Sequence, residues 1–182
     1  MFGTSTYHQT IRKMVVAFGS LFNDISVKRV NSSGVVVETL KIPVAYGPKQ
    51  KFMVRIANPA LAGTPAIILP RIGFMMSQIM YDGTRKLNTV GKNSSTISGT
   101  LRTQYNPVPY NFDFELTAAV DNAEDGAQIF EQIVPFFTPE FTVSVNLVPS
   151  MNVKPDVSII LNGTTTEDSY EGDFTTRREI IW

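Results

Sequence analysis

The feature that most constrains the fold is a strand–helix–strand pattern between Tyr110 and Val148. Residues 110–120 alternate between apolar and polar side chains, and this period of two predicts a strand with one buried face. The expected buried face consists of Tyr110, Phe112, Phe114, Leu116, Ala118 and Val120.

A helix is expected directly after this strand. Asp121 or Asn122 provides the side chain that caps a helix N-terminus, and carboxylates in the first turn suit the helix dipole. Pro135 is expected to end the helix, since proline cannot donate the backbone hydrogen bond that a helix interior needs. Residues 141–147 alternate again and predict a second half-buried strand.

The rest of the chain adds one more long helix and several strands. Apolar residues recur at helical spacing over 7–22, and Pro48 can open a short helical turn. The predicted strands are 25–30 and 35–44, joined by a turn at Asn31–Gly34, then 66–69, 73–81, 157–161 and 175–182.

These elements predict the fold class. Two principal helices among many strands, without regular βαβ alternation, indicate an α+β fold with a mainly antiparallel twisted sheet on which the helices pack. The length of 182 residues favours one domain, 1–182, carrying a long polar loop at about 82–106. Because the last strand runs up to Trp182 without a following turn, we expect the natural chain to continue.

Composition excludes several classes of protein. Lys plus Arg number 16 and Asp plus Glu number 16, so the chain lacks the basic excess of a general nucleic-acid or membrane-surface binder. The absence of cysteine excludes disulfides, thiolate metal sites and cysteine nucleophiles. No apolar run approaches the roughly 20 residues that span a bilayer, so we expect no membrane contact.

Few residues suggest catalysis. His8 is the single histidine, and no nucleophile elbow or phosphate-binding glycine loop accompanies it. Asp113 and Glu115 share the polar face of the 110–120 strand, and paired carboxylates can hydrolyse glycosides or hold metals. That face is expected to be solvated or to meet another subunit, so we expect no enzyme, no cofactor and no metal.

The polar loop offers a candidate binding site. Arg85, Lys86, Lys92 and Arg102 lie among serine, threonine and glycine, and such a basic loop can contact phosphates without reading base sequence. A solvated loop is the simpler interpretation. An acidic loop over 162–173 lacks the ligand spacing of an EF-hand and is interpreted as solvated or as paired with basic residues of a neighbour.

Several segments, taken in their order along the chain, resemble those of one known family. They are Met1–Gly3 with the helix that follows, Leu69–Ile72, Gln104–Pro109, Gln128–Phe137, Pro139 and Arg177–Trp182. Together they are similar to the tail sheath stabiliser and completion protein, or tail terminator, of large contractile-tailed bacteriophages. The resemblance spans nearly the whole chain, although relatives generally continue past the position of Trp182.

The resemblance implies a structural role with a tail-terminator-like fold. It implies a ring, normally a hexamer, that caps the tail tube and contractile sheath, holds the sheath extended and joins the neck proteins of the head. Double-stranded DNA would pass through its channel, where Arg85, Lys86, Lys92 and Arg102 are candidate contacts. The location would be the head-proximal end of the virion tail, after assembly in the host bacterial cytoplasm. The alternatives are another neck or tail joining protein, a DNA-binding module and, last, a carboxylate-dependent hydrolase.

Overall fold

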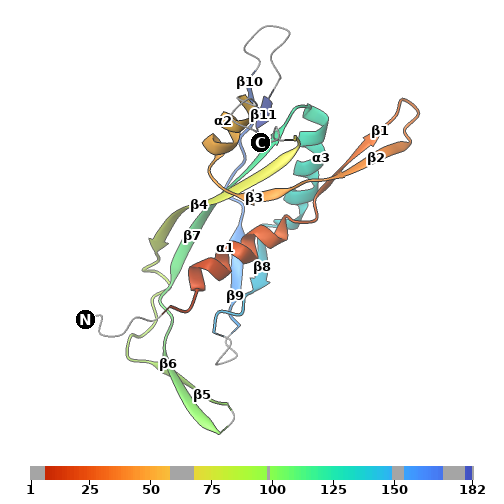
Figure 1. Cartoon of the computed structure of the whole chain (residues 1–182). Coiled ribbons are helices and arrows are strands. Elements are labelled where there is room, and N and C mark those ends of the chain that lie inside the picture. The colour runs from red at the N-terminus through yellow and green to blue at the C-terminus, as the bar shows by residue number, and fades with distance from the viewer. Residues whose placement is uncertain (1–6, 58–67, 98, 149–153, 170–178, 182) are drawn as a thin grey trace.

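The computed structural model describes residues 7–57, 68–97, 99–148, 154–169 and 179–181. Within these residues the chain has an α+β fold with three α-helices and mostly antiparallel sheets, as the sequence predicts (Figure 1). A central five-stranded sheet forms the body, and three separate two-stranded sheets surround it.

The central sheet is built on two long antiparallel strands. β4 (Arg71–Tyr81) and β7 (Tyr110–Val120) pair along their whole length, with a register irregularity between Met76 and Gln78. The remaining strands extend the sheet on both sides in the order β10-β11-β7-β4-β3. β3 (Val44–Tyr46) runs parallel to β4, whereas β11 (Glu179–Ile181) and β10 (Glu167–Ser169) are antiparallel to their neighbours.

Three β hairpins form the two-stranded sheets. In Figure 1 the β1–β2 hairpin, called the first hairpin below, leaves the body on one side, and the β5–β6 hairpin, the second hairpin, forms the opposite end of an elongated molecule. The pairs are β1 (Ser26–Val30) with β2 (Val36–Lys41), β5 (Lys92–Ile97) with β6 (Thr100–Tyr105), and β8 (Glu140–Ser144) with β9 (Asp156–Ile160).

The helices cover the sheet unequally. α1 (Thr10–Leu21) and α3 (Ala123–Ile133) share a core with one face of β7, and the short α2 (Lys49–Ala57) lies on the other face. The side chain of Asn122 caps α3 by accepting from the backbone N–H of Glu124 at 3.1 Å. α3 ends at Ile133, and Pro135 falls in the following 3₁₀ turn, as expected.

The main core lies where β7 ends. Val27, Ile42, Ile72 and Val120 are fully buried there, together with Ile129 of α3. The expected single buried face is wrong at both ends of β7, because Tyr110 is 48% exposed and Ala119, on the polar register, is 8% exposed. α2 covers the second face near Ala119, and no described helix covers the Tyr110 end.

Two glycines let aromatic rings come close to the backbone. A Cβ on Gly19 would lie 2.4 Å from the ring of Phe74, and a Cβ on Gly73 would lie 2.4 Å from the ring of Phe52. The Phe74 ring is held by neighbouring rings, with centroids 5.7 Å away in Phe18 and 5.4 Å away in Tyr46. Gly19 is therefore a packing residue of α1 and not only a weak point in its helix propensity.

Two local predictions need correction. Residues 82–106 are not only a loop, because β5 and β6 form a hairpin inside this segment. Threonine, a β-branched residue that favours strands, is present on both strands, and Gly99 lies in the turn at φ 78°. The strand expected at 66–69 is absent at 68–69, and β4 begins at Arg71. Residues 66–67, 175–178 and 182 of the predicted strands lie outside the described residues.

Candidate interaction surfaces

Two of the four predicted basic residues lie on the β5–β6 hairpin. Lys92 pairs with Tyr105 in the strand register, and its Nζ lies 5.0 Å from the centre of that ring. Arg102 pairs with Ser95. Directly opposed residues share a face and neighbours in a strand alternate, so Lys92 and Arg102 lie on opposite faces of the hairpin.

Arg85 is held in a turn before the hairpin. The carboxylate of Asp82 accepts from the Thr84 hydroxyl at 2.6 Å, from the Thr84 N–H at 2.9 Å and from Arg85 Nε at 2.7 Å. Arg85 also donates to the side chain of Asn111 on β7. These bonds, the Thr84 hydroxyl first and Arg85 second, hold the pKa of Asp82 well below its usual value of 3.8.

The four basic residues therefore do not form one patch. Lys86 is exposed beside the Asp82 turn, Arg85 already bridges this turn to β7, and the other two residues lie on different faces of the hairpin. The structure places them all toward the β5–β6 end of the molecule, which is a looser arrangement than a single phosphate-binding cluster.

The candidate catalytic histidine lies apart from the candidate carboxylates. His8 is exposed just before α1, whereas Asp113 and Glu115 lie on β7 opposite Gln78 and Met75. Among the described residues, no three His, Cys, Asp or Glu side chains come together as a metal site would require.

Asp125 is one of the two carboxylates in the first turn of α3, and it has a second role. It is 2% exposed, and its carboxylate accepts a hydrogen bond from Arg29 of β1 at 3.2 Å. A buried charge needs such a partner, so this ion pair fixes the first hairpin to α3.

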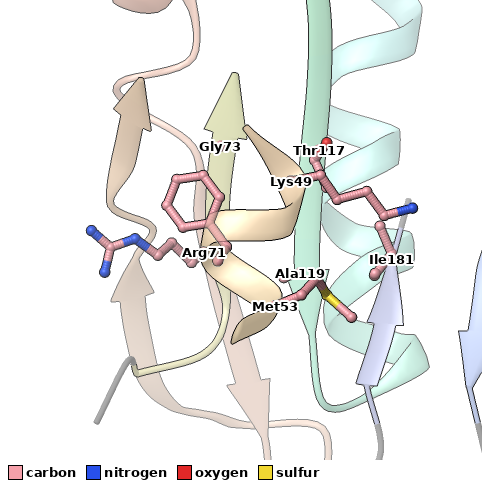
Figure 2. Close-up of a pocket in the computed structure, with 8 residues that line it drawn as sticks. Lys49, Met53, Arg71, Gly73, Thr117, Ala119 and Ile181 are labelled. Atoms are coloured by element: carbon pink, nitrogen blue, oxygen red, sulfur yellow. The ribbon is translucent and has the colours of Figure 1, made fainter. Parts of the chain in front are cut away.

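The acidic segment is partly described. Glu167 of β10 bonds to Lys49 of α2 at 2.5 Å, so one expected acidic residue pairs with a base of its own chain. Figure 2 shows Lys49 and Met53 of α2 beside Thr117 and Ala119 of β7, with Lys49 and Arg71 pointing in opposite directions. The cavity between α2 and the sheet measures only about 10 Å³, so α2 is packed against the sheet and leaves no ligand site there.

Sequence reasoning missed the attachment of the β1–β2 hairpin. Gln128 and Gln132 of α3 each bond to both backbone groups of one residue of β1, Lys28 and Ser26 respectively. The signal was present as two glutamines at i and i+4, a spacing that places both side chains on one side of a helix. Without knowledge of which strand lies beside α3, that spacing has no visible purpose.

Two groups of exposed apolar side chains lie far from the helices that cover the sheet. Val30, Val35, Val36 and Val37 form the outer part of the first hairpin, with exposures from 49% to 70%. The second group lies at the end of β4, at the start of β7 and on β6 of the second hairpin. They are Ile79, Met80, Tyr81, Tyr110, Leu101 and Tyr105. Exposed apolar residues that lie near one another in this way are candidates for an interaction surface.

No helix in the described part of the chain has the length and apolar character required to cross a membrane.

Comparison with known proteins identifies the family. The family described as T4-like virus Myoviridae tail sheath stabiliser matches residues 5–182. The tail completion protein gp15 of Enterobacteria phage T4 is 30% identical over 188 residues, which cover 97% of this chain and 67% of that protein. The chain therefore belongs to the tail sheath stabiliser family of T4-like Myoviridae viruses, a family of structural phage tail proteins.

Proposed function

We propose that this chain forms a ring, normally a hexamer, that caps the tail tube and the contractile sheath at the head-proximal end of the virion tail. The ring holds the sheath in its extended state and offers the surface to which the neck proteins of the head join. Assembly takes place in the cytoplasm of the host bacterium. The observation that carries this proposal is the family match over residues 5–182, together with the tail completion role in the relative's name.

The shape of the molecule supports assembly. A closed ring requires two different surfaces on each subunit, because the contact is head-to-tail. The chain offers the β1–β2 hairpin with its exposed valines on one side, and the β5–β6 hairpin with the exposed ends of β4 and β7 on another. An isolated two-stranded hairpin is marginally stable in water, so the β5–β6 hairpin would gain stability from a neighbour.

The basic residues have a proposed role in the channel. DNA leaving the head would contact the ring transiently, and Lys86, Lys92 and Arg102 on the β5–β6 side are the proposed phosphate contacts. Arg85 is a weaker candidate, since its guanidinium is already bonded to Asp82 and Asn111. Because Lys92 and Arg102 lie on opposite hairpin faces, only one of them can face the DNA unless the other meets a neighbouring subunit.

We also propose that the role is structural and not enzymatic. The carboxylates Asp113 and Glu115 lie beside Gln78 and Met75 in the sheet, and Asp125 is engaged by Arg29. A neck or tail joining role without sheath contact is the second candidate, favoured by the exposed apolar residues at both ends of the molecule.

The experiment uses tails assembled without this protein. We expect purified chain to bind their head-proximal end as a ring in negative-stain images and to keep the sheath extended on storage. Tails incubated with buffer alone are the control, and their sheaths are expected to disassemble or contract. Binding to the tail without any effect on the sheath favours the joining role, and no binding to tails contradicts both.

A further inference from the structure

The two outer edges of the β1–β2 sheet differ in whether their backbone groups are hydrogen-bonded. The edge of β1 is closed by α3. The Gln128 amide accepts from Lys28 N–H at 2.9 Å and donates to Lys28 C=O at 3.0 Å. Gln132 accepts from Ser26 N–H at 3.3 Å and donates to Ser26 C=O at 2.8 Å.

The geometry explains why two glutamines can replace a strand. Residues i and i+4 of a helix are separated by about 6 Å along its axis, at about 1.5 Å per residue. Residues i and i+2 of a strand are separated by about 6.6 Å, at about 3.3 Å per residue. The spacing of Gln128 and Gln132 along α3 therefore matches the spacing of Lys28 and Ser26 along β1. A side-chain amide also offers the same donor and acceptor as a backbone peptide.

The edge of β2 has no such cover among the described residues. Because both backbone groups of Lys28 point to α3, Lys28 and its partner Thr39 form a pair without mutual hydrogen bonds. Ile42 N–H bonds to Ile25 C=O at 3.0 Å, so the next pair, Ser26 with Lys41, is also one without mutual hydrogen bonds. The N–H and C=O groups of Thr39 and Lys41 therefore point outward, away from β1.

We propose that the open edge of β2 takes an extended strand from a second copy of this chain, namely residues 164–168. This inference rests on the proposed ring and assigns one of its subunit contacts. Addition of a strand to an open edge supplies backbone hydrogen bonds at once, and neighbouring side chains then set specificity.

The chemistry of the two segments is complementary. Lys28 pairs with Thr39, and Lys41 pairs with Ser26, two residues before Lys28. Residues two apart in a strand share a face, so Lys28 and Lys41 lie on the same face of the hairpin. Residues 164–166 are three threonines, a β-branched type that favours strands, and Glu167 and Asp168 follow them. Residues 164–168 are exposed, and β10, where this run ends, is the outermost described strand of the central sheet.

Two features limit the site to a short strand. Val37 is the extra residue at the register shift, since Arg29 pairs with Glu38 and Val30 pairs with Val36. Such a bulge ends regular pairing, so the usable edge runs from Glu38 to Lys41. The ion pairs of Lys41 with Asp24 and of Glu167 with Lys49 are partly exposed, and exposed pairs contribute little. They do not prevent the segments from meeting.

A proline scan of β2 tests the proposal. Thr39→Pro removes only an outward N–H, and edge strands tolerate proline in that orientation. We expect Thr39→Pro to keep a cooperative thermal transition and to weaken self-association at least tenfold in sedimentation velocity. Leu40→Pro is the matched control: it removes a hydrogen bond to β1, so it is expected to lower the thermal midpoint as well.

An engineered disulfide gives a second readout that does not depend on proline. The chain has no cysteine, so any bridge in Thr39→Cys/Thr166→Cys involves only these two positions, and the two single variants show how much of it joins like positions of two copies. We expect linked dimers and higher species under mild oxidation, and only background from the same chain with Ser94→Cys in place of Thr166→Cys.

The outcomes separate this contact from the ring itself. Wild-type chain that stays monomeric at every concentration overturns both proposals. A wild-type ring that survives Thr39→Pro unchanged, with no linked species from the cysteine pair, overturns the β2 contact and leaves the ring standing.

Discussion

At the scale of single residues, environment changes the meaning of a side chain. Gly19 looks like a weak point in a helix when only the sequence is read, but the ring of Phe74 fills the space that a Cβ would need. From the sequence, Asp125 is a first-turn carboxylate that suits the helix dipole, and the structure adds that it is buried and bonded to Arg29. Both differences arise because residues far apart in the chain pack beside them.

The Asp82 turn gives a prediction at this scale. Thr84→Val removes the hydroxyl that is the first cause of the lowered pKa of Asp82, so we expect that pKa to rise toward 3.8. Titration of the Asp82 carboxyl by NMR measures it, and Thr103→Val on the second hairpin is the control. Because the folded pKa is the lower one, the turn's stabilisation is complete above the usual value and is lost as pH falls through the folded value. An unchanged pKa in Thr84→Val contradicts this account.

At the scale of elements, hairpins were easier to predict than their attachments. The turn at Asn31–Gly34 identifies the first hairpin, and Gly34 adopts the expected positive φ of 76°. The polar hairpin of β5 and β6 was expected as a loop, because the sequence has no apolar alternation there. Its pairing depends on β propensity and the Gly99 turn, without a core beneath it.

The glutamine clamp of Gln128 and Gln132 gives the prediction at this scale. Gln132→Met keeps the size of the side chain but leaves both backbone groups of Ser26 unpaired in a partly buried place. We expect a loss of about 1–3 kcal/mol in the free energy of unfolding, measured with urea. Gln128→Met is expected to cost less, because Lys28 is exposed and water replaces the bonds.

Two comparisons check the clamp. Gln50→Met on the exposed side of α2 is the matched control and is expected to be near neutral. Hydrogen exchange is expected to speed up at the Ser26 amide in Gln132→Met, while the Val27 amide, which belongs to the pair with Leu40, stays protected. Equal stability of Gln132→Met and wild type contradicts the clamp.

At the scale of the whole molecule, stability and interaction are separated in space. The core lies among α1, α3 and one end of the central sheet, whereas two groups of exposed apolar residues lie on the first hairpin and at the opposite end. This division suits the proposed ring, because surfaces that bind neighbours must stay open until assembly.

Removal of the second hairpin tests the division. The N–H of Asn106 bonds to the C=O of Gly91 at 3.0 Å, so the two ends are close enough for Asn-Gly to replace residues 92–105. We expect the thermal midpoint to change by only about 4 °C or less, because the hairpin adds little to the core. Binding to tails is expected to fall. The variant Lys92→Gln/Arg102→Gln keeps the strands and separates the effect of charge on tail binding from that of shape. A large loss of stability on removal of residues 92–105 contradicts the division.

The sequence by itself determined the α+β class, the long β7 strand, the capped helix after it and the first hairpin, because periodicity, capping and turn chemistry are local properties. It also carried the resemblance that the family match confirms. Only the tertiary structure decided that Ala119 is buried, that Arg85 is engaged by Asp82, and that α3 closes the β1 edge while no described residue covers the β2 edge. These depend on which segments lie side by side, and no local pattern records that.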